Sequence, residues 1–189
     1  MNLILASQSP RRKELLGLLG IDFEIRVADI DEAMDPTADP RQEVARVSRL
    51  KARAVPKEPE DVVIAADTIV VCQGKILGKP KDSEDAKRML RLLSGRDHQV
   101  MTGLCVLRGQ EEIAVTEVTD LHFRALTDEE IDRYVASGEP MDKAGAYGIQ
   151  GGAALFCERM EGDYYNVVGL PVCRLSQILR TMLSDLTNK

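Results

Sequence analysis

Asp67 is the residue whose surroundings most strongly indicate chemistry. It lies in the middle of the most apolar run of the chain, which extends from residue 61 to residue 71. An ionised carboxylate among apolar side chains is costly unless a cation or hydrogen-bond donors oppose it, so a purely structural aspartate is the less favoured interpretation. We expect Asp67 to be a metal ligand or a general base. Thr68 follows it, with its hydroxyl group expected on the opposite side of the strand.

The first helix is expected to begin at a site for anions. Ser9 suits the N-cap position, and the backbone N–H groups of the following turn attract negative charge. Yet Arg11 and Arg12 follow directly, and cations in a first turn cost roughly 0.3–1 kcal/mol each when nothing opposes them. Together with Ser7, these residues predict a binding site for a phosphate chain rather than for a single carboxylate.

Lysines add to the positive charge available for such a ligand. Lys51 shares one face of the second expected helix with Val44 and Val47, so it interrupts an apolar stripe. It either extends to solvent, which is the default for such a lysine, or points inward to a bound phosphate. Lys79 and Lys81 follow the second arm of an expected hairpin.

Two loops have two interpretations each. Asp31 and Glu32 lie in an acidic segment with two prolines, and are either solvated or ligands of a metal ion. Residues 139–152 contain four glycines within eight residues and form either a flexible surface loop or a recognition loop. Recognition is the more economical account, because Lys143 and Gln150 supply diverse hydrogen-bonding groups there.

The elements that must position these residues alternate between strand and helix patterns. Ser83 is expected to cap the third helix, and Thr127 with Glu130 to form a capping box on the fourth. The expected strands cover residues 3–6, 23–28, 61–71, 76–78, 99–107, 112–124, 153–159 and 164–168, and the expected helices cover 10–19, 40–55, 83–93, 127–136 and the chain from 171.

Composition limits the class of protein. A chain of 189 residues with 30% charged and 44% hydrophobic residues predicts one soluble globular domain, residues 1–189, with one core. We see no apolar run of membrane-spanning length and no secretory signal, so a cytoplasmic location is expected and a membrane partner is not. The net charge of −6 opposes a nucleic-acid polymer as partner but allows a small polyanion.

The cysteines and histidines do not have the spacing of a metal site. Cys72, Cys105, Cys157 and Cys173 are far apart in the sequence, which favours buried free thiols over disulfide bonds. The two histidines have no neighbours at metal-ligand spacing, so zinc is not expected.

Five short motifs follow one another along the chain, namely Ser7-Gln-Ser-Pro-Arg-Arg, Ala66-Asp-Thr, Gly78-Lys-Pro, Asp142-Lys-Ala-Gly-Ala-Tyr-Gly-Ile-Gln-Gly and Asn166-Val-Val-Gly-Leu-Pro. In this order, they resemble the motifs of the Maf family of nucleoside triphosphate pyrophosphatases. The resemblance extends from Leu3 to about Pro171. It implies an α/β fold with an elongated mixed β-sheet flanked by helices, and two lobes with a central cleft, as in the inosine triphosphate pyrophosphatases.

Within that family, Lys143 and the segment from Tyr147 to Gly151 resemble the dTTP/UTP pyrophosphatase branch rather than the 7-methyl-GTP branch. A physical reason agrees, since the Gln150 amide can both donate and accept a hydrogen bond, as O4 and N3–H of uracil or thymine require. The resemblance further implies that Arg12 and Thr68, with Gln150, select the substrate.

The resemblance also implies catalytic roles. Asp67 has the position of the proton acceptor, and Glu32, Lys51 and Lys79 fall where the family places active-site groups. We expect Asp67 and Glu32 to hold a divalent cation, Mg²⁺ or Mn²⁺, whose bound water Asp67 deprotonates. Arg11, Arg12, Lys51 and Lys79 would bind the phosphate oxygens. The products would be a nucleoside monophosphate and pyrophosphate.

Two other functions remain open at this point. The beginning of the chain also resembles that of sugar-nucleotide pyrophosphorylases, although those have a longer glycine-rich first turn. A nucleotide-responsive regulator of septum formation, without turnover, is the non-enzymatic alternative. The sequence leaves open whether canonical or modified pyrimidine nucleotides are the physiological substrates, and whether the chain forms a homodimer.

Overall fold

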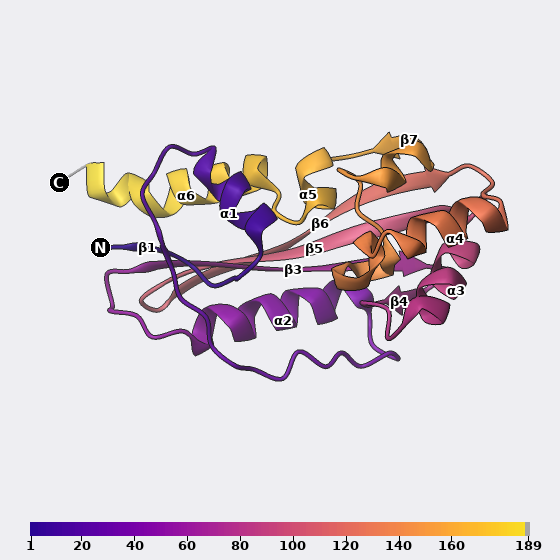
Figure 1. The fold of residues 1–189 in the computed structure, drawn as a ribbon. Helices are drawn as coiled ribbons and strands as arrows, with labels where there is room; N and C mark the ends of the chain where they lie inside the picture. The colour runs from indigo at the N-terminus through magenta and orange to yellow at the C-terminus, as the bar shows by residue number, and fades with distance from the viewer. Residues whose placement is uncertain (188–189) are drawn as a thin grey trace. The chain divides into compact units, whose positions relative to one another are not determined.

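The computed structural model describes residues 1–187 and contains a seven-stranded mixed β-sheet with helices packed on it (Figure 1). The predicted mixed α/β class is therefore confirmed. The strands are β1 Leu3–Leu5, β2 Glu24–Ile25, β3 Val62–Cys72, β4 Lys75–Leu77, β5 Asp97–Arg108, β6 Glu111–Phe123 and β7 Cys157–Glu161. The α-helices are α1 Pro10–Gly17, α2 Pro40–Ala54, α3 Ser83–Leu93, α4 Asp128–Ala136, α5 Tyr164–Val168 and α6 Val172–Thr187, and the short 3-10 helices are η1 Glu139–Asp142, η2 Ala144–Ala146 and η3 Gly152–Leu155.

The strand order of the sheet is β2-β1-β3-β5-β6-β7, and β4 pairs with β3 outside this path. β1 is parallel to both β2 and β3, whereas β3 with β4 and β6 with β7 form antiparallel pairs. The long apolar strand β3 is central, as its composition predicts, because a strand covered on both faces must be apolar along its length. Asp67 is thus carried by the middle of the sheet.

The chain divides into two compact units. Unit 1 comprises residues 1–67, 102–117 and 169–189, and unit 2 comprises residues 68–101 and 118–168. The predicted single domain, the elongation of the sheet and the predicted cleft remain predictions.

In unit 1, α2 covers one face of the strands, and α1 and α6 cover the other (Figure 1). Apolar side chains of β1, β3, β5 and α2 fill the space on one face, among them Ile4, Val63, Ala52 and Cys105. Gly103 of β5 lies directly under α2, because a Cβ atom at that position would overlap the Val44 carbonyl group. Helix and sheet therefore approach closely at this point.

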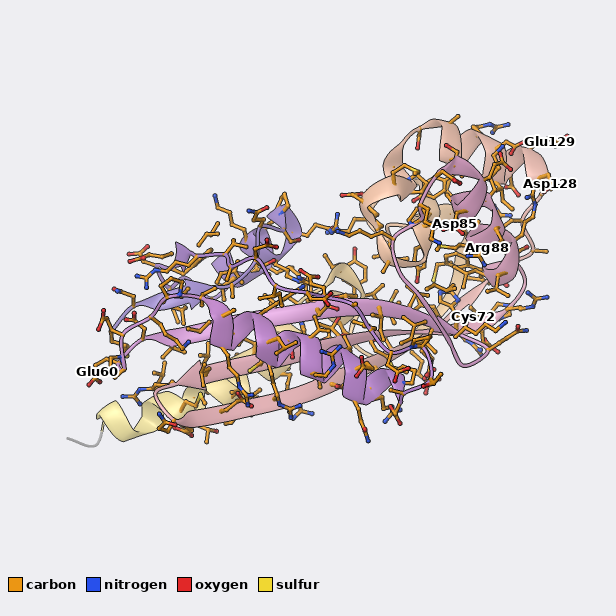
Figure 2. The ribbon with its side chains drawn as sticks, turned by 90° about the horizontal axis from the view of Figure 1, so that it is seen from below. Glu60, Cys72, Asp85, Arg88, Asp128 and Glu129 are labelled. Carbon is orange, nitrogen blue, oxygen red and sulfur yellow. The ribbon has the colours of Figure 1, made fainter. Side chains whose placement is uncertain are left out.

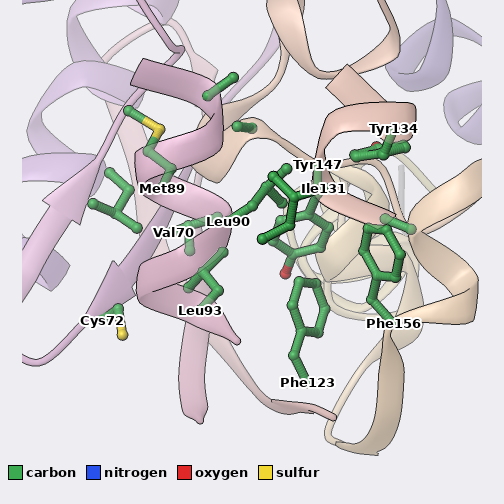
Figure 3. Packing of buried hydrophobic residues seen from close by; sticks show 14 of the residues in the cluster. Val70, Cys72, Met89, Leu90, Leu93, Phe123, Ile131, Tyr134, Tyr147 and Phe156 are labelled. Atoms are coloured by element: carbon green, nitrogen blue, oxygen red, sulfur yellow. The ribbon is translucent and has the colours of Figure 1, made fainter. Parts of the chain in front are cut away.

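In unit 2, α3 and α4 pack side by side over β3, β5 and β6 (Figure 3). The buried face of α3 consists of Ala86, Met89, Leu90 and Leu93, as its periodicity predicts. Its outer face carries ion pairs such as Arg88 Nη2 with Asp85 Oδ1 at 2.7 Å (Figure 2). The amphipathic pattern of α3 therefore separates core from surface as expected.

Several local predictions were wrong. Residues 164–168 form helix α5 rather than a strand, because the Asp163 carboxylate accepts a hydrogen bond from Tyr165 N–H and starts a helical turn. The buried side chain of Asn166 in this helix donates to Val100 O and to Thr119 Oγ1.

Other boundaries and exposures also differ. The expected strand 153–159 begins only at residue 157, after η3, and the expected strand 23–28 is reduced to two residues. Asp82, not Ser83, caps α3, since its carboxylate accepts from Asp85 N–H. Cys173 is exposed rather than buried. In the described residues, we find no helix that is both long and apolar enough to cross a membrane.

Candidate active site

The N-terminus of α1 holds Arg12 in a defined position. Ser9 is the N-cap, as predicted, and its hydroxyl oxygen accepts from Arg12 N–H. The Ser7 hydroxyl oxygen accepts from Ser9 N–H at 3.2 Å and from Arg12 Nη1 at 3.4 Å. Arg12 Nε donates to the Gly169 carbonyl oxygen at 2.8 Å. The guanidinium group is therefore held by a backbone carbonyl group, that of Gly169, and by a side-chain hydroxyl group, that of Ser7.

Arg12 also interacts electrostatically with the carboxylates of Asp67 and Glu32 in the same unit. Burial lowers the pKa of Arg12, and the negative charges of Asp67 and Glu32 act in the opposite direction, while Arg11 adds to the lowering. Arginine remains protonated despite such a shift. The first turn of α1 contains no acidic residue, so the negative charge that opposes Arg12 comes from Asp67 and Glu32 elsewhere in unit 1.

Lys51 points inward. Val44 and Val47, on the same face of α2, are fully buried, and the close approach of α2 to Gly103 holds this face against the sheet. Only 14% of the Lys51 side chain is exposed, and its Nζ lies 2.6 Å from Asp67 Oδ1. The default interpretation, that Lys51 extends to solvent, is therefore wrong.

Lys51 joins two acidic residues that are 35 positions apart in the sequence. Its Nζ lies 2.8 Å from Glu32 Oε2 as well as close to Asp67. Glu32 is 56% exposed and Asp67 only 13%. The solvated-loop interpretation of Glu32 thus accounts for its exposure but not for its ion pair, and the cost of burying Asp67 is offset by the neighbouring ammonium group.

Glu32 and Asp67 also suit a divalent metal ion. Mg²⁺ commonly binds one or two protein carboxylates and completes its shell with water and substrate phosphates. In the part of the chain that the structure describes, there is no group of three or more His, Cys, Asp or Glu side chains that could hold a metal ion. The two converging carboxylates therefore fit an ion that is bound together with a phosphate ligand.

Unit 2 carries the remaining residues that the sequence singled out. Lys79 is exposed in the segment after β4, and Thr68 is partly exposed on β3. Lys143 Nζ donates to the Glu139 carbonyl oxygen at 2.7 Å and pairs with Asp142 Oδ1 at 2.7 Å. Gln150 is exposed.

The glycine-rich segment of unit 2 is anchored at its beginning. Gly145 has a φ of 68° and donates its N–H to the Gly78 carbonyl oxygen at 3.0 Å. A Cβ atom at this position would lie 2.7 Å from Val70 Cγ2, so only glycine fits. This contact places the glycine-rich segment beside the backbone that carries Lys79.

Tyr147 anchors the same segment in the core. Its hydroxyl group lies 2.9 Å from His98 Nε2, and its ring packs against Phe123 with centroids 4.8 Å apart (Figure 3). Burial lowers the pKa of His98 to about 4, so this hydrogen bond joins two neutral groups at neutral pH. The interpretation of residues 139–152 as a flexible surface loop does not fit these contacts.

The predicted site residues fall into two groups. In unit 1, the structure brings Ser7 and Ser9 into contact with Arg12. It also brings Glu32 and Asp67 into contact with Lys51. Arg11 lies next to Arg12 in the first turn of α1. The residues in unit 2 are Thr68, Lys79, Lys143 and Gln150. Contact within a unit does not assign a catalytic role, so the roles of all these residues remain predictions.

Sequence reasoning did not identify the residues that support the site. Gly169, whose carbonyl oxygen accepts a hydrogen bond from Arg12, lies in the last of the five motifs but had no predicted role. Gly103, which lets α2 approach the sheet, is an isolated glycine in a strand and gives only a weak signal. Tyr134 belongs to a helix with an ordinary core pattern, and Glu139, the first residue of the segment 139–152, was not singled out within it, yet both contact the glycines of that segment.

Comparison with known proteins identifies the family. A family model described as Maf-like protein matches residues 2–182. The chain is 53% identical over 182 residues to a dTTP/UTP pyrophosphatase of Anaeromyxobacter dehalogenans (strain 2CP-C), covering 94% of this chain and 92% of that protein. It is 54% identical over 173 residues to a dTTP/UTP pyrophosphatase of Geobacillus sp. (strain WCH70), and this match covers 91% of this chain and 93% of that protein.

One similar solved structure is that of a HAM1 protein from Coxiella burnetii. The match covers 96% of this chain and 99% of that chain, with 15% sequence identity and a TM-score of 0.49. A TM-score of this size does not support an assignment. The family model and the two curated relatives each cover more than nine-tenths of the chain. The chain therefore belongs to the Maf family.

Proposed function

We propose that this protein is a nucleoside triphosphate pyrophosphatase that hydrolyses dTTP and UTP to the monophosphate and pyrophosphate. The observation that carries the proposal is the position of Lys51 between the carboxylates of Asp67 and Glu32 in unit 1. The curated relatives described above are named for the same activity. A cytoplasmic location, a homodimer and a single domain stay predictions from the sequence.

The charge distribution of this group suits hydrolysis of a phosphoanhydride. A nucleoside triphosphate brings several negative charges, and more charge develops on the departing pyrophosphate. Arg12, Arg11, Lys51 and Lys79 are the cations that we propose for its oxygens. Arg12 is already held by Ser7 and Gly169, so little conformational freedom is lost when phosphate binds.

Asp67 is the proposed general base. Water attacks the α-phosphorus, and its proton passes to the Asp67 carboxylate. The bond between the α-phosphorus and the bridging oxygen breaks, and pyrophosphate leaves with the electron pair of that bond. The hydroxyl oxygen of water remains on the nucleoside monophosphate, so atoms and charge balance without an oxidant or reductant.

A divalent metal ion is part of the proposal. Glu32 and Asp67 would hold Mg²⁺ or Mn²⁺ together with the substrate phosphates. When bound, the metal ion supplies positive charge to the phosphate oxygens and lowers the pKa of coordinated water. Lys51, which contacts both carboxylates, sets the electrostatic balance of that site.

Base selection is assigned to Gln150 and Thr68, with Arg12 at the phosphate end. The Gln150 amide nitrogen can donate to O4 of thymine or uracil, and its oxygen can accept from N3–H. Cytosine has an amino group at C4 and no proton on N3, so the same amide would have to reverse both bonds. Exposure of Gln150 agrees with a role in ligand contact.

Product analysis in ¹⁸O-labelled water tests this function. The protein is incubated with dTTP and Mg²⁺, and products are separated and weighed by mass spectrometry. We expect dTMP and pyrophosphate in equal amounts, with the label in dTMP, and turnover that is lower by roughly 10²–10⁴-fold in the Asp67→Asn variant. A reaction that needs no sugar phosphate also excludes the pyrophosphorylase alternative.

Other products would contradict the proposal in specific ways. Formation of dTDP and inorganic phosphate would place cleavage at the wrong bond. Label in pyrophosphate would move the attack to the β-phosphorus. Binding of dTTP without hydrolysis over hours, with metal present, would favour the regulatory alternative.

A further inference from the structure

Gln150 lies in a segment that has little intrinsic rigidity. Three glycines, Gly148, Gly151 and Gly152, lie within two positions of it. Gly151 N–H donates to the Gly148 carbonyl oxygen at 3.1 Å, which closes a tight turn whose central residues are Ile149 and Gln150. A glycine-rich turn of this kind has a large conformational entropy, so its shape must be maintained by contacts from outside the turn.

The Tyr134 hydroxyl group of α4 supplies one such contact. It accepts a hydrogen bond from Gly148 N–H at 3.1 Å and donates to Glu139 Oε1 at 2.9 Å. The ring is buried against Phe156, with centroids 5.2 Å apart (Figure 3). Burial raises the pKa of Tyr134, so the hydroxyl group stays protonated and remains a donor at neutral pH.

The Glu139 carboxylate supplies the second contact. While Oε1 accepts from Tyr134, Oε2 accepts from Gly152 N–H at 3.0 Å. The Tyr134 hydroxyl and the Glu139 carboxylate thus form a connected pair that binds the backbone two residues before Gln150 and two residues after it. Neither side chain belongs to the site residues that the sequence predicted.

The glycines are where this arrangement requires them. A Cβ atom at Gly148 would lie 2.6 Å from Lys143 Cε, and one at Gly152 would lie 3.2 Å from Tyr134 Cδ2. A Cβ atom at Gly151 would overlap the Glu139 carboxylate. The turn therefore lies close to Glu139, and the absence of side chains at these glycines permits this approach.

We propose that Tyr134 and Glu139 are positioning residues that hold the Gln150 turn in the shape that distinguishes thymine and uracil from cytosine. The inference rests on the proposed function, in which Gln150 reads the base. A purely structural role is the alternative, because a tyrosine on the apolar face of a helix often serves only as core. Ring packing, however, uses no hydroxyl group, and here the hydroxyl group carries both hydrogen bonds.

The Tyr134→Phe variant separates these roles, because it keeps the ring and removes the hydroxyl group. We expect the ratio of kcat/KM for dTTP to kcat/KM for dCTP to fall roughly tenfold, since loss of hydrogen bonds of ordinary strength changes an equilibrium by about that factor. The change should come mainly from a higher KM for dTTP, with kcat within about threefold of the wild-type value. Glu139→Gln, which keeps one acceptor oxygen, should lower the same ratio less.

Two controls make the test specific. Tyr165→Phe removes a hydroxyl group from an exposed tyrosine of the same unit and should leave the ratio unchanged. In a Gln150→Ala background, Tyr134→Phe should lower the ratio no further, because residues that act through one group are not additive. Amide exchange measured by NMR should become faster at Gly148 in Tyr134→Phe and at Gly152 in Glu139→Gln.

The outcomes separate the inference from the function on which it rests. A wild-type enzyme that prefers dTTP, with variants that keep its ratio or lose both activities by the same factor, would overturn the inference alone. A wild-type enzyme with no preference for dTTP over dCTP would overturn base selection and with it the inference. A further fall of the dTTP to dCTP ratio when Tyr134→Phe is added to Gln150→Ala would also contradict the inference.

Discussion

The residues of unit 1 and unit 2 that we connect with function are held in different ways. In unit 1, Lys51 is held by charge, with Nζ within 3 Å of oxygens from Asp67 and Glu32. In unit 2, the turn that carries Gln150 is held by backbone N–H groups that donate to Tyr134 and Glu139. In the proposed function, unit 1 provides most of the charges for bond cleavage, with Lys79 as the cation from unit 2, whereas the turn of unit 2 provides the shape for base selection.

Replacing Asp67 should have the largest effect. Asp67→Asn keeps the size of the side chain and removes its charge, and general bases typically contribute roughly 10²–10⁴-fold to rate. We expect kcat for dTTP to fall by about that factor with saturating Mg²⁺, while the preference for dTTP over dCTP stays within about twofold. Steady-state kinetics with both nucleotides measure this, and near-normal turnover would show that Asp67 is not the base.

Glu32 should give a smaller loss that depends on metal. Glu32→Gln removes one of the two carboxylates at Lys51, so we expect kcat/KM to fall roughly 10- to 100-fold and the Mg²⁺ concentration for half-maximal rate to rise. The matched control is Asp31→Asn, one position earlier in the same loop, where the carboxylate accepts from Ala33 N–H. Equal losses in both variants would show that only the charge of the loop matters.

Gln150→Ala should change selection more than rate. The side chain is exposed, and loss of paired hydrogen bonds to a base changes discrimination by roughly 10- to 100-fold. We expect the dTTP to dCTP ratio of kcat/KM to fall by about that factor while kcat for dTTP falls less than about threefold. If kcat fell as much as in Asp67→Asn, the contrast between the two units would be wrong.

Replacing Glu130 should change how the stability of the fold depends on pH in acid, without any effect on activity. Its hydrogen bonds with Arg124, at 2.7 Å, and with Thr127 N–H lower the pKa of Glu130 to about 2, below the value of 4.5 that is usual for glutamate. A lowered pKa stabilises the fold above the unfolded-state pKa, and this stabilisation is lost as pH falls towards the folded-state pKa.

The Glu130→Gln variant tests this capping box of α4. Its Tm should be lower than that of the wild-type protein at pH 7, and the difference should shrink between about pH 4.5 and pH 2, over the interval set by the two pKa values. Thermal unfolding followed by circular dichroism measures it. The kcat and the dTTP to dCTP ratio at pH 7 should match those of the wild-type protein, and a difference in Tm that persists at pH 2 would assign the effect to packing.

The sequence indicated the charged residues that meet in unit 1 better than the residues that support the turn of unit 2. Asp67 and Lys51 are polar residues that interrupt apolar patterns, and such interruptions can be seen in a single chain. Glu32 remained ambiguous because its contact with Lys51 depends on the path of an irregular loop. Gln150 was identified from a resemblance, but the contacts that hold its turn were not.

Tyr134 shows why that support could not be predicted. Its place on the apolar face of α4 indicates core, and the sequence contains no sign that its hydroxyl group reaches a backbone amide 14 positions later. The wrong strand at 164–168 has a similar cause. Tyrosine and valine there favour a strand, yet one side-chain acceptor, Asp163, and the buried amide of Asn166 stabilise a helix.

The most direct test compares four proteins, namely wild type, Asp67→Asn, Gln150→Ala and the variant with both changes, by kcat/KM for dTTP and for dCTP. If unit 1 provides cleavage and unit 2 provides selection, Asp67→Asn lowers both constants by the same large factor, Gln150→Ala changes only their ratio, and the two effects multiply in the double variant. An altered ratio in Asp67→Asn, or an unchanged ratio in Gln150→Ala, would contradict the account.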